Sequence, residues 1–285
     1  MKVLLSLLLS AFIITSTAQS IRFEVPWMDY ENFFEPKDIE LKSIASITFF
    51  QKVKKDGKPM GRKRKILKYI FNKNGFLTQS IKYASNMQRL DSNFFQYDYN
   101  EMNQLIRKDE HMGNFHFSYR FTYMNGKKNK MVKIDMRQNP QDTTLIRYYE
   151  HLNAPDYDLE VVKNELEIAF QKNRKIFDEK GRLIKQRNSY LRNAQFNEQR
   201  FIYEGKLLLQ IDFNSSYTTY KSQKWLFSYK QNELDLIRCF RMDKLHLKYA
   251  LLYNENGFLE NIIERSVIDH TVTVFDLEIS QFNQN

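Results

Sequence analysis

Apolar and polar residues alternate through most of the chain in short runs, and one turn pattern recurs between the runs. Four segments share an aromatic residue, Asn or Asp, two further residues, Gly or Asn, any residue, and Leu: residues 71–77, 99–105, 177–183 and 253–259. The flanks alternate as strands do, for example Ile66, Lys68 and Ile70 before the first turn. The pattern predicts β-hairpins.

The spacing between the aromatic residues is close to 26. Phe71 and Tyr253 are 182 residues apart, which is seven intervals of 26. Positions counted in steps of 26 from Phe71 fall within two residues of the aromatic residues at 99, 123, 177, 203 and 229. The one remaining position, near residue 149, holds Tyr148 and Tyr149 without a turn motif. A fixed period of this kind indicates a repeat architecture.

The residue types in each unit suit a tight antiparallel turn. Asn or Asp after a strand can bond its own backbone and start the turn. Gly, or Asn in its place, accepts the positive φ that closes it. Five of the eight glycines lie in these turns: Gly75, Gly126, Gly181, Gly205 and Gly257. We therefore interpret the repeated residues as turn and core.

We expect an all-β fold in which antiparallel β-hairpin repeats, with a period of about 26 residues, form a curved meander or shell-like sheet over residues 45–285. Roughly sixteen strands are too many for one flat sheet. Residues 45–68 are expected to form the first hairpin and residues 268–282 the last strand. Residues 158–172 fit a helix or a strand, and the repeat favours a strand from about Leu166. Residues 138–158 fit the repeat least and are the candidate for an irregular insertion or domain break.

One copy carries a family resemblance. Residues 175–183, Lys-Ile-Phe-Asp-Glu-Lys-Gly-Arg-Leu, resemble the Tyr-Asp (YD) repeat of Rhs-type proteins, in which an aromatic residue, Asp and a two-residue gap precede Gly-Arg-Leu. The resemblance extends as a spaced pattern over about residues 66–264, with Asn often in place of Asp. It implies long antiparallel sheets that coil into shells or spirals, and it implies no catalytic residues.

The N-terminus has the organisation of a secretory signal peptide over residues 1–19. Lys2 precedes an apolar run from Val3 to Ile14, and small residues lead to Ala18. We expect cleavage after Ala18, an N-terminal extension over residues 20–44, and a secreted or periplasmic location. No later stretch is long and apolar enough for a transmembrane helix.

Composition narrows the class of protein further. The 285 residues are 42% hydrophobic and 15% aromatic, which is ample for a packed core, and the formal net charge is +10. The single cysteine, Cys239, excludes a disulfide framework and lies in an apolar context where we expect a buried, inert thiol.

The sequence offers little catalytic chemistry. His111 and His116 are five residues apart and would face opposite sides of one strand, so we expect packing or surface histidines rather than metal ligands. The pairs Asp156–Asp158 and Glu165–Glu167 have the spacing of one strand face, which a hydrolase or a calcium site could use. We expect no enzyme activity, no cofactor and no metal.

The strongest charged feature lies between residues 52 and 68, where nine Lys and Arg residues accompany a single acid, Asp56. Such a cluster could bind an anionic glycan or another envelope component. Alternatively, the charges protect an exposed first strand from edge pairing. Because the chain is expected to be exported, nucleic acid is not an expected partner. The candidate binding residues are Lys52, Lys54, Lys55, Lys58, Arg62, Lys63, Arg64 and Lys65.

Aromatic residues that recur on neighbouring repeats form a second candidate surface for sugar rings or a peptide strand. Cross-strand packing is the simpler interpretation. These residues are Tyr97, Tyr99, Tyr119, Tyr123, Tyr217, Tyr220, Trp225 and Tyr229.

The expected function is that of a non-catalytic secreted or periplasmic interaction protein that presents an extended β-repeat surface to a glycan, an envelope component or a protein. The alternatives are an envelope-associated hydrolase and an outer-membrane β-barrel. Frequent Lys, Arg and Glu residues on the alternating faces weigh against the barrel.

Overall fold

The computed structural model describes residues 34–83, 93–138, 140–154, 156–216 and 222–283. These residues form one short helix, α1 (Pro36–Leu41), and eighteen strands. The strands are β1 (Ile44–Lys54), β2 (Arg64–Phe71), β3 (Leu77–Lys82), β4 (Asn93–Tyr99), β5 (Leu105–Met112), β6 (Phe115–Met124), β7 (Lys127–Asp135), β8 (Asp142–Ala154), β9 (Tyr157–Lys163), β10 (Ala169–Phe177), β11 (Leu183–Tyr190), β12 (Gln195–Glu204), β13 (Leu207–Ser215), β14 (Ser222–Lys230), β15 (Glu233–Arg241), β16 (Lys244–Tyr253), β17 (Leu259–Ser266) and β18 (Val272–Gln281).

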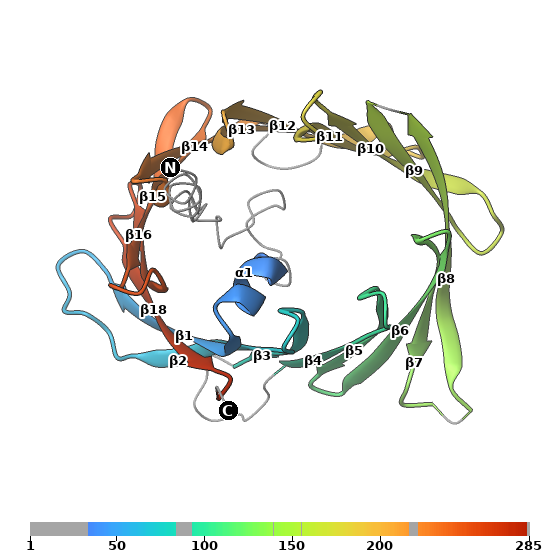
Figure 1. Ribbon diagram of the computed structural model, residues 1–285, viewed down its shortest axis with the longest axis horizontal. Coiled ribbons are helices and arrows are strands. Elements are labelled where there is room, and N and C mark those ends of the chain that lie inside the picture. Colours follow the sequence, from blue (N-terminus) through green and yellow to red (C-terminus); the bar gives the residue numbers. More distant parts are fainter. Residues whose placement is uncertain (1–33, 84–92, 139, 155, 217–221, 284–285) are drawn as a thin grey trace, which may run out of the picture.

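The strands form a closed antiparallel barrel. Each strand pairs with the next one along the chain, and β1 pairs with β18 as well as with β2. The sheet therefore has no free edge, and Figure 1 shows it as a ring. With strands about 4.8 Å apart and tilted by about 40°, eighteen strands enclose a barrel roughly 35 Å across, too wide for its own side chains to fill.

The expected antiparallel all-β meander is confirmed, and one part of the prediction is corrected. The sheet is a closed barrel of eighteen strands, not an open curved or shell-like sheet of roughly sixteen. The turn and alternation patterns are local. Closure depends on register between the two ends of the chain, where Ile47 pairs with Ile279 and Phe49 with Leu277.

The turns have the chemistry that the repeat predicts. The side chains of Asn72, Asn100, Asp178 and Asn254 each accept hydrogen bonds of 2.9–3.1 Å from the backbone N–H groups two and four residues later. The fourth residue of each turn has a positive φ, for example 78° at Gly75. These turns connect β2–β3, β4–β5, β10–β11 and β16–β17, all at the same end of the barrel.

The aromatic and Leu residues of the repeat pair across each hairpin. Phe71 pairs with Leu77, Tyr99 with Leu105, Phe177 with Leu183, Tyr203 with Leu208, Tyr229 with Leu234, and Tyr253 with Leu259. Four tyrosines also bond the preceding hairpin, because the hydroxyls of Tyr99, Tyr123, Tyr203 and Tyr229 donate to the main-chain carbonyls of Leu77, Leu105, Leu183 and Leu208 at 2.8–3.1 Å. The repeat thus links neighbouring hairpins as well as closing each one.

Helix α1 lies inside the ring (Figure 1) and packs near β1 and β2. The Phe34 ring, just ahead of the helix, is 6.2 Å from Phe49 and from Tyr69 and 6.3 Å from Phe71, measured between centroids. At Gly75 a Cβ atom would lie only 1.9 Å from the Pro36 carbonyl oxygen, so this turn needs glycine for contact with the helix as well as for its φ.

Other expected segments have mixed outcomes. The first hairpin is β1 and β2, and the last strand is β18. The ambiguous segment holds no helix: β9 ends at Lys163, residues 164–168 turn, and β10 begins at Ala169, so the strand starts later than expected. Most of the region that fits the repeat least forms β8, paired with β7 and β9. The expected signal peptide lies outside the described residues.

Candidate functional site

The strand register separates an inner wall from an outer wall. Phe49, Tyr69 and Phe71 contact Phe34 next to α1, so they face the interior. Residues that pair directly share a face, and successive residues alternate between faces. This assignment can therefore be carried from strand to strand around the ring. At β18 it places Leu277 on the inner face, and Leu277 pairs with the inward residue Phe49, so the assignment is consistent around the whole ring.

The inner wall is apolar over β14–β18 and β1–β4. Its fully buried side chains include Tyr69, Tyr249, Ile47 and Ile237, which are at most 2% exposed. Aromatic anchors from the repeat, such as Tyr229 and Tyr253, belong to this lining, where burial raises the pKa of Tyr229 to about 12. This sector is the main core of the molecule, and α1 covers part of it.

The inner wall turns polar on the other side of the ring. One inward residue from each of six consecutive strands, β8–β13, lies in direct cross-strand register. We call this set the polar row. Its members are His151, Glu160, Asn173, Asn188, Asn197 and Ser215.

Hydrogen bonds connect part of the polar row. Asn173 Nδ2 donates to Glu160 Oε1 at 2.7 Å, and His151 Nε2 lies 3.9 Å from Glu160 Oε2. His151 Nε2 is also 2.6 Å from the carbonyl oxygen of Lys128. Desolvation lowers the pKa of Lys128, whose ammonium lies 3.8 Å from the centre of the Tyr149 ring. Polar and aromatic groups are therefore mixed on this part of the wall.

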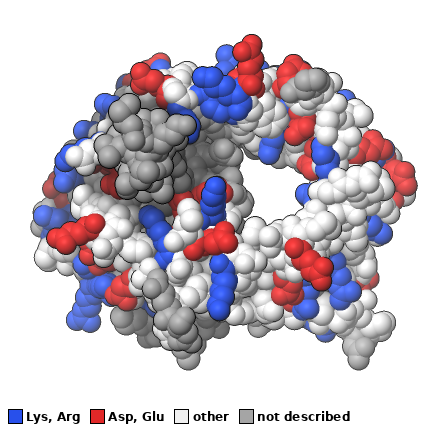
Figure 2. Space-filling model, viewed as in Figure 1, with Lys and Arg blue, Asp and Glu red and all other residues white. Residues whose placement is uncertain are grey.

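The outer wall is charged around nearly the whole ring. Every strand except β3 contributes at least one ionisable side chain to the outward face, and Figure 2 shows charged groups around the rim. One such residue per strand, in chain order, is Lys52, Lys68, Asp98, Arg107, Arg120, Lys130, Glu150, Lys163, Lys172, Lys185, Glu198, Asp212, Lys224, Arg238, Lys248, Arg265 and Asp276.

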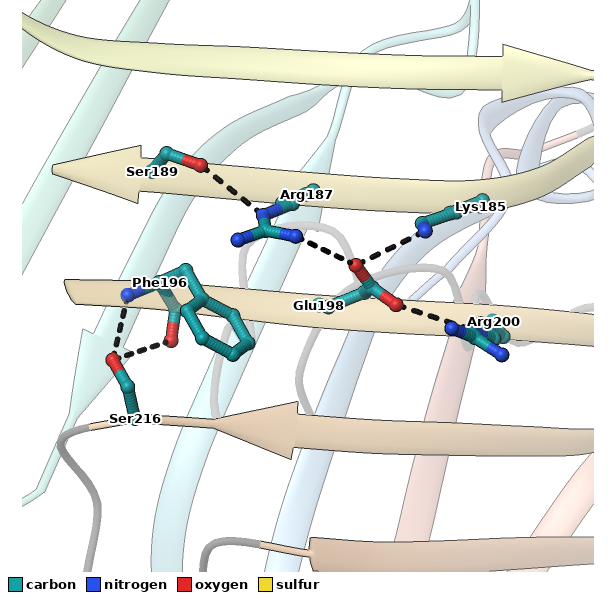
Figure 3. Close-up of polar contacts among 7 residues, drawn as sticks. All are labelled: Lys185, Arg187, Ser189, Phe196, Glu198, Arg200 and Ser216. Atoms are coloured by element: carbon teal, nitrogen blue, oxygen red, sulfur yellow. Dashed lines mark hydrogen bonds and ion pairs between the residues drawn. The ribbon is translucent and has the colours of Figure 1, made fainter. Parts of the chain in front are cut away.

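Glu198 is the most highly connected acid of the outer wall (Figure 3). Its carboxylate lies 3.1 Å from Lys185 Nζ, 3.4 Å from Arg187 Nη1 and 3.0 Å from Arg200 Nε. Burial alone would raise the pKa of Glu198, but the hydrogen bonds from Lys185 and Arg200 hold it below its ordinary value. Such a network suits a wall that faces water.

The predicted basic residues lie at one end of the barrel, on β1, β2 and the loop between them, and they divide into two groups. Lys52 forms an ion pair of 2.7 Å with Asp276, and Lys63 is 3.0 Å from Glu278 and 4.3 Å from the Phe50 ring centre. Arg64 contacts Gln51, and the Lys65 ammonium lies 4.6 Å from the Tyr83 ring centre. Lys54, Lys55, Lys58 and Arg62 are exposed and form no ion pair with the described residues. We call these four residues the basic hairpin.

The histidine prediction needs a correction. His111 and His116 lie on two strands, β5 and β6, with a turn between them, so they pair on one face with ring centroids 3.8 Å apart. Burial and the neighbouring His111 lower the pKa of His116. No group of three or more metal-ligating side chains occurs in the part of the chain that the structure describes. Cys239 is fully buried, and burial raises the pKa of its thiol to about 11.

The predicted aromatic surface lies on the inner wall. Tyr97, Tyr99, Tyr119, Tyr123, Trp225 and Tyr229 all face the interior, whereas Tyr217 and Tyr220 lie outside the described residues. The polar row was not predicted from the sequence. Its members are 9 to 18 residues apart in the chain, and only the strand register brings them together.

The strands thus form a closed antiparallel β-barrel that has charged side chains on nearly every strand of its outer wall and an inner wall with one apolar and one polar sector. Among the described residues no helix is long and apolar enough to cross a membrane.

Neither family models nor curated proteins match the chain. Among solved structures, it is similar to a porin-like protein from Bacteroides uniformis ATCC 8492, with a TM-score of 0.41 and 10% identity over 84% of this chain and 97% of the other. A porin-like protein from Bacteroides vulgatus ATCC 8482 gives a TM-score of 0.39 and 11% identity over 74% and 98% of the two chains. A chain in the TcdB2-TccC3-Cdc42 structure gives a TM-score of 0.22 and 9% identity, over 70% of this chain and 15% of the other.

Proposed function

We propose that the protein is a non-enzymatic barrel of the cell envelope or the exterior whose outer wall faces water and whose interior binds a ligand. The observation that carries this proposal is the distribution of polarity between the two walls. A barrel that spans a membrane has an outward apolar band about 25 Å tall and a polar interior. Here the outward faces carry charged side chains on nearly every strand, and the inward faces carry most of the buried aromatic and aliphatic side chains, together with charged groups such as Lys108, Lys133 and Arg147.

The energetic cost of lipid contact supports this assignment. A Lys or Arg side chain facing lipid at the bilayer midplane costs about 2–4 kcal/mol. Lys172, Lys224 and Lys248 all face outward from different strands and form no ion pair with the described residues. The cost falls to about 0–1 kcal/mol near the interfaces, so it applies to those outward Lys and Arg side chains that would lie at the middle of the bilayer.

Interior binding follows from the size of the barrel. The ring is too wide for its own side chains to fill, and Figure 2 shows an opening through it. Inward aromatic side chains that are only half-buried, such as Tyr149 and Tyr190, suit recognition of a ligand with aromatic or ring-shaped surfaces. We therefore place the proposed binding surface in the interior of the barrel.

A second candidate is an outer-membrane barrel. Complete closure supports it, because spanning strands must satisfy every backbone group and leave no edge. The leader-like N-terminus is compatible with either candidate.

Fractionation separates the two candidates. We expect the exported protein to remain soluble and monodisperse without detergent. The triple variant Lys172→Leu, Lys224→Leu and Lys248→Leu should then lose solubility, because it places apolar groups in water. Recovery of the wild type only in detergent, with unchanged or better membrane insertion of the triple variant, would establish the membrane barrel and overturn our proposal.

A further inference from the structure

We propose that the polar row is a subsite for a neutral carbohydrate chain that lies across the inner wall. This inference rests on the proposed interior binding and adds the class of ligand. The row spans six neighbouring strands without a break. Strands are about 4.8 Å apart, so the row extends for roughly 24 Å around the wall, enough for several linked sugar rings.

The chemistry of the row matches sugar hydroxyls. An amide carries donors and an acceptor, and a hydroxyl group can serve as either partner. Asn173 already donates to Glu160 and accepts a 2.6 Å hydrogen bond from Gln171 Nε2, so a sugar hydroxyl would join or replace these bonds. The Oδ1 atom of Asn188 has no hydrogen-bond partner within the described residues, so this amide can reorient toward a ligand without breaking an internal bond at that atom. Ser215, at the end of the row, is buried and closes it on that side.

The charge balance favours a neutral ligand. Within the row only His151 and Glu160 are ionisable, and they face each other at 3.9 Å. On the adjacent inward positions, Lys175 pairs in register with Asp158. Since neither sign is in excess, an acidic or basic chain would find no compensating charge on entering this part of the barrel.

Aromatic groups border the row on both sides. Tyr149 and Tyr190 face inward at adjacent positions of β8 and β11, toward one end of the barrel. Toward the other end, a shallow pocket opens with Lys175, Phe177, Leu183 and Tyr203 in its lining. Flat aromatic faces next to hydrogen-bonding groups provide the stacking and polar contacts that ring-shaped polar ligands require.

The row lies on a part of the inner wall that helix α1 does not cover. The strands that carry it, β8–β13, lie across the ring from α1 (Figure 1), and the opening in Figure 2 lies next to part of this wall. The apolar sector packs against α1 instead. A ligand bound at the row would therefore not compete with the helix for the same part of the wall.

Calorimetric titration tests the proposal with defined probes: cellohexaose, laminarihexaose, mannohexaose and xylohexaose, with the acidic hexagalacturonan as comparator. We expect at least one neutral hexasaccharide to bind the detergent-free protein more tightly than hexagalacturonan. The double variant Asn173→Leu and Asn188→Leu should weaken that binding at least tenfold. The control variant Asn214→Leu, on the outward face of β13, should change it less than twofold.

Several results would overturn the assignment. These are no binding of any neutral hexasaccharide, tighter binding of hexagalacturonan, or equal affinity in the double variant with circular dichroism showing an intact sheet. The proposed function fails separately, through a protein that can be obtained only in detergent. A soluble protein that binds none of the sugars overturns the carbohydrate assignment alone.

Discussion

The hydroxyl of Tyr99 donates a 2.9 Å hydrogen bond to the main-chain carbonyl of Leu77, in the hairpin before its own. The same bond recurs between Tyr203 and Leu183 and between Tyr229 and Leu208. The regular spacing of the repeat thus has a physical role, because each of these tyrosines links its hairpin to the previous one.

Removing one of these hydroxyls should lower stability. We expect Tyr99→Phe to lower the free energy of unfolding by about 1 kcal/mol, since a partly buried carbonyl loses its partner. Urea unfolding followed by circular dichroism measures the change. The matched control is Tyr148→Phe on the outward face of β8, where the hydroxyl bonds no described residue. Equal effects of the two substitutions would show that the hydroxyl bond contributes nothing.

Two turn glycines should respond differently to alanine. Gly181 has a φ of 74° and open space where a Cβ atom would lie, so Gly181→Ala should cost about 1–2 kcal/mol from backbone strain alone. Gly75→Ala adds a clash with the Pro36 carbonyl and should cost about 1–3 kcal/mol more. It should also increase hydrogen exchange over residues 36–42. Similar costs for the two variants, without faster exchange, would mean that α1 does not pack on this turn.

Acid should destabilise the protein through Asp135. Hydrogen bonds from Arg137 hold the pKa of Asp135 at about 2, below its ordinary value near 4. A lowered pKa stabilises the folded state above pH 4, and this stabilisation disappears as the pH falls through 2. Urea unfolding from pH 2 to 6 should therefore show that the free energy of unfolding changes less with pH in Asp135→Asn than in the wild type. Asp56→Asn, in the exposed loop, should keep the wild-type dependence of the free energy of unfolding on pH. The wild-type dependence in both variants would contradict the role of Asp135.

The basic hairpin should bind polyanions in a salt-dependent manner. We expect the protein to bind immobilised heparin at low salt, and the variant with alanine at Lys54, Lys55, Lys58 and Arg62 to elute at a clearly lower salt concentration. Alanine at four outward basic residues elsewhere on the ring controls for net charge: Lys172, Arg174, Lys248 and Arg265. Equal shifts for both variants would indicate a general charge effect and no site.

Sequence reasoning recovered the local features of the fold and missed the global one. Asn or Asp at the start of a turn and Gly at its fourth position are sufficient signals, because the turn bonds involve only neighbouring residues. The turn at residues 164–168 has the same bonds from Asn164, but Glu167 holds the positive φ of 58° where the pattern expects Gly. Lys163 also replaces the aromatic residue and Ala169 the Leu, so this copy of the turn could not be recognised from the pattern.

The candidate site was recovered only in part. Alternation showed which residues share a face, yet it could not show which face lies inside, since that depends on the contact of Phe34 with Tyr69. The basic residues were visible as a charge run, but two of them are neutralised by Asp276 and Glu278 from the far end of the chain. The polar row depends on register across six strands and has no local signal.

The pairing of β1 with β18 also determines the order in which the molecule can form. A hairpin chain can fold progressively as it is made, but the ring cannot close until its last strand is available. Joining residues so far apart in the chain has a high entropic cost and is intrinsically slow. Until then, β1 presents an unpaired edge on which Lys52 and Lys54 oppose association with other chains. Completion of the barrel is therefore the final folding step, and it removes the edge at which unfinished molecules could pair with one another.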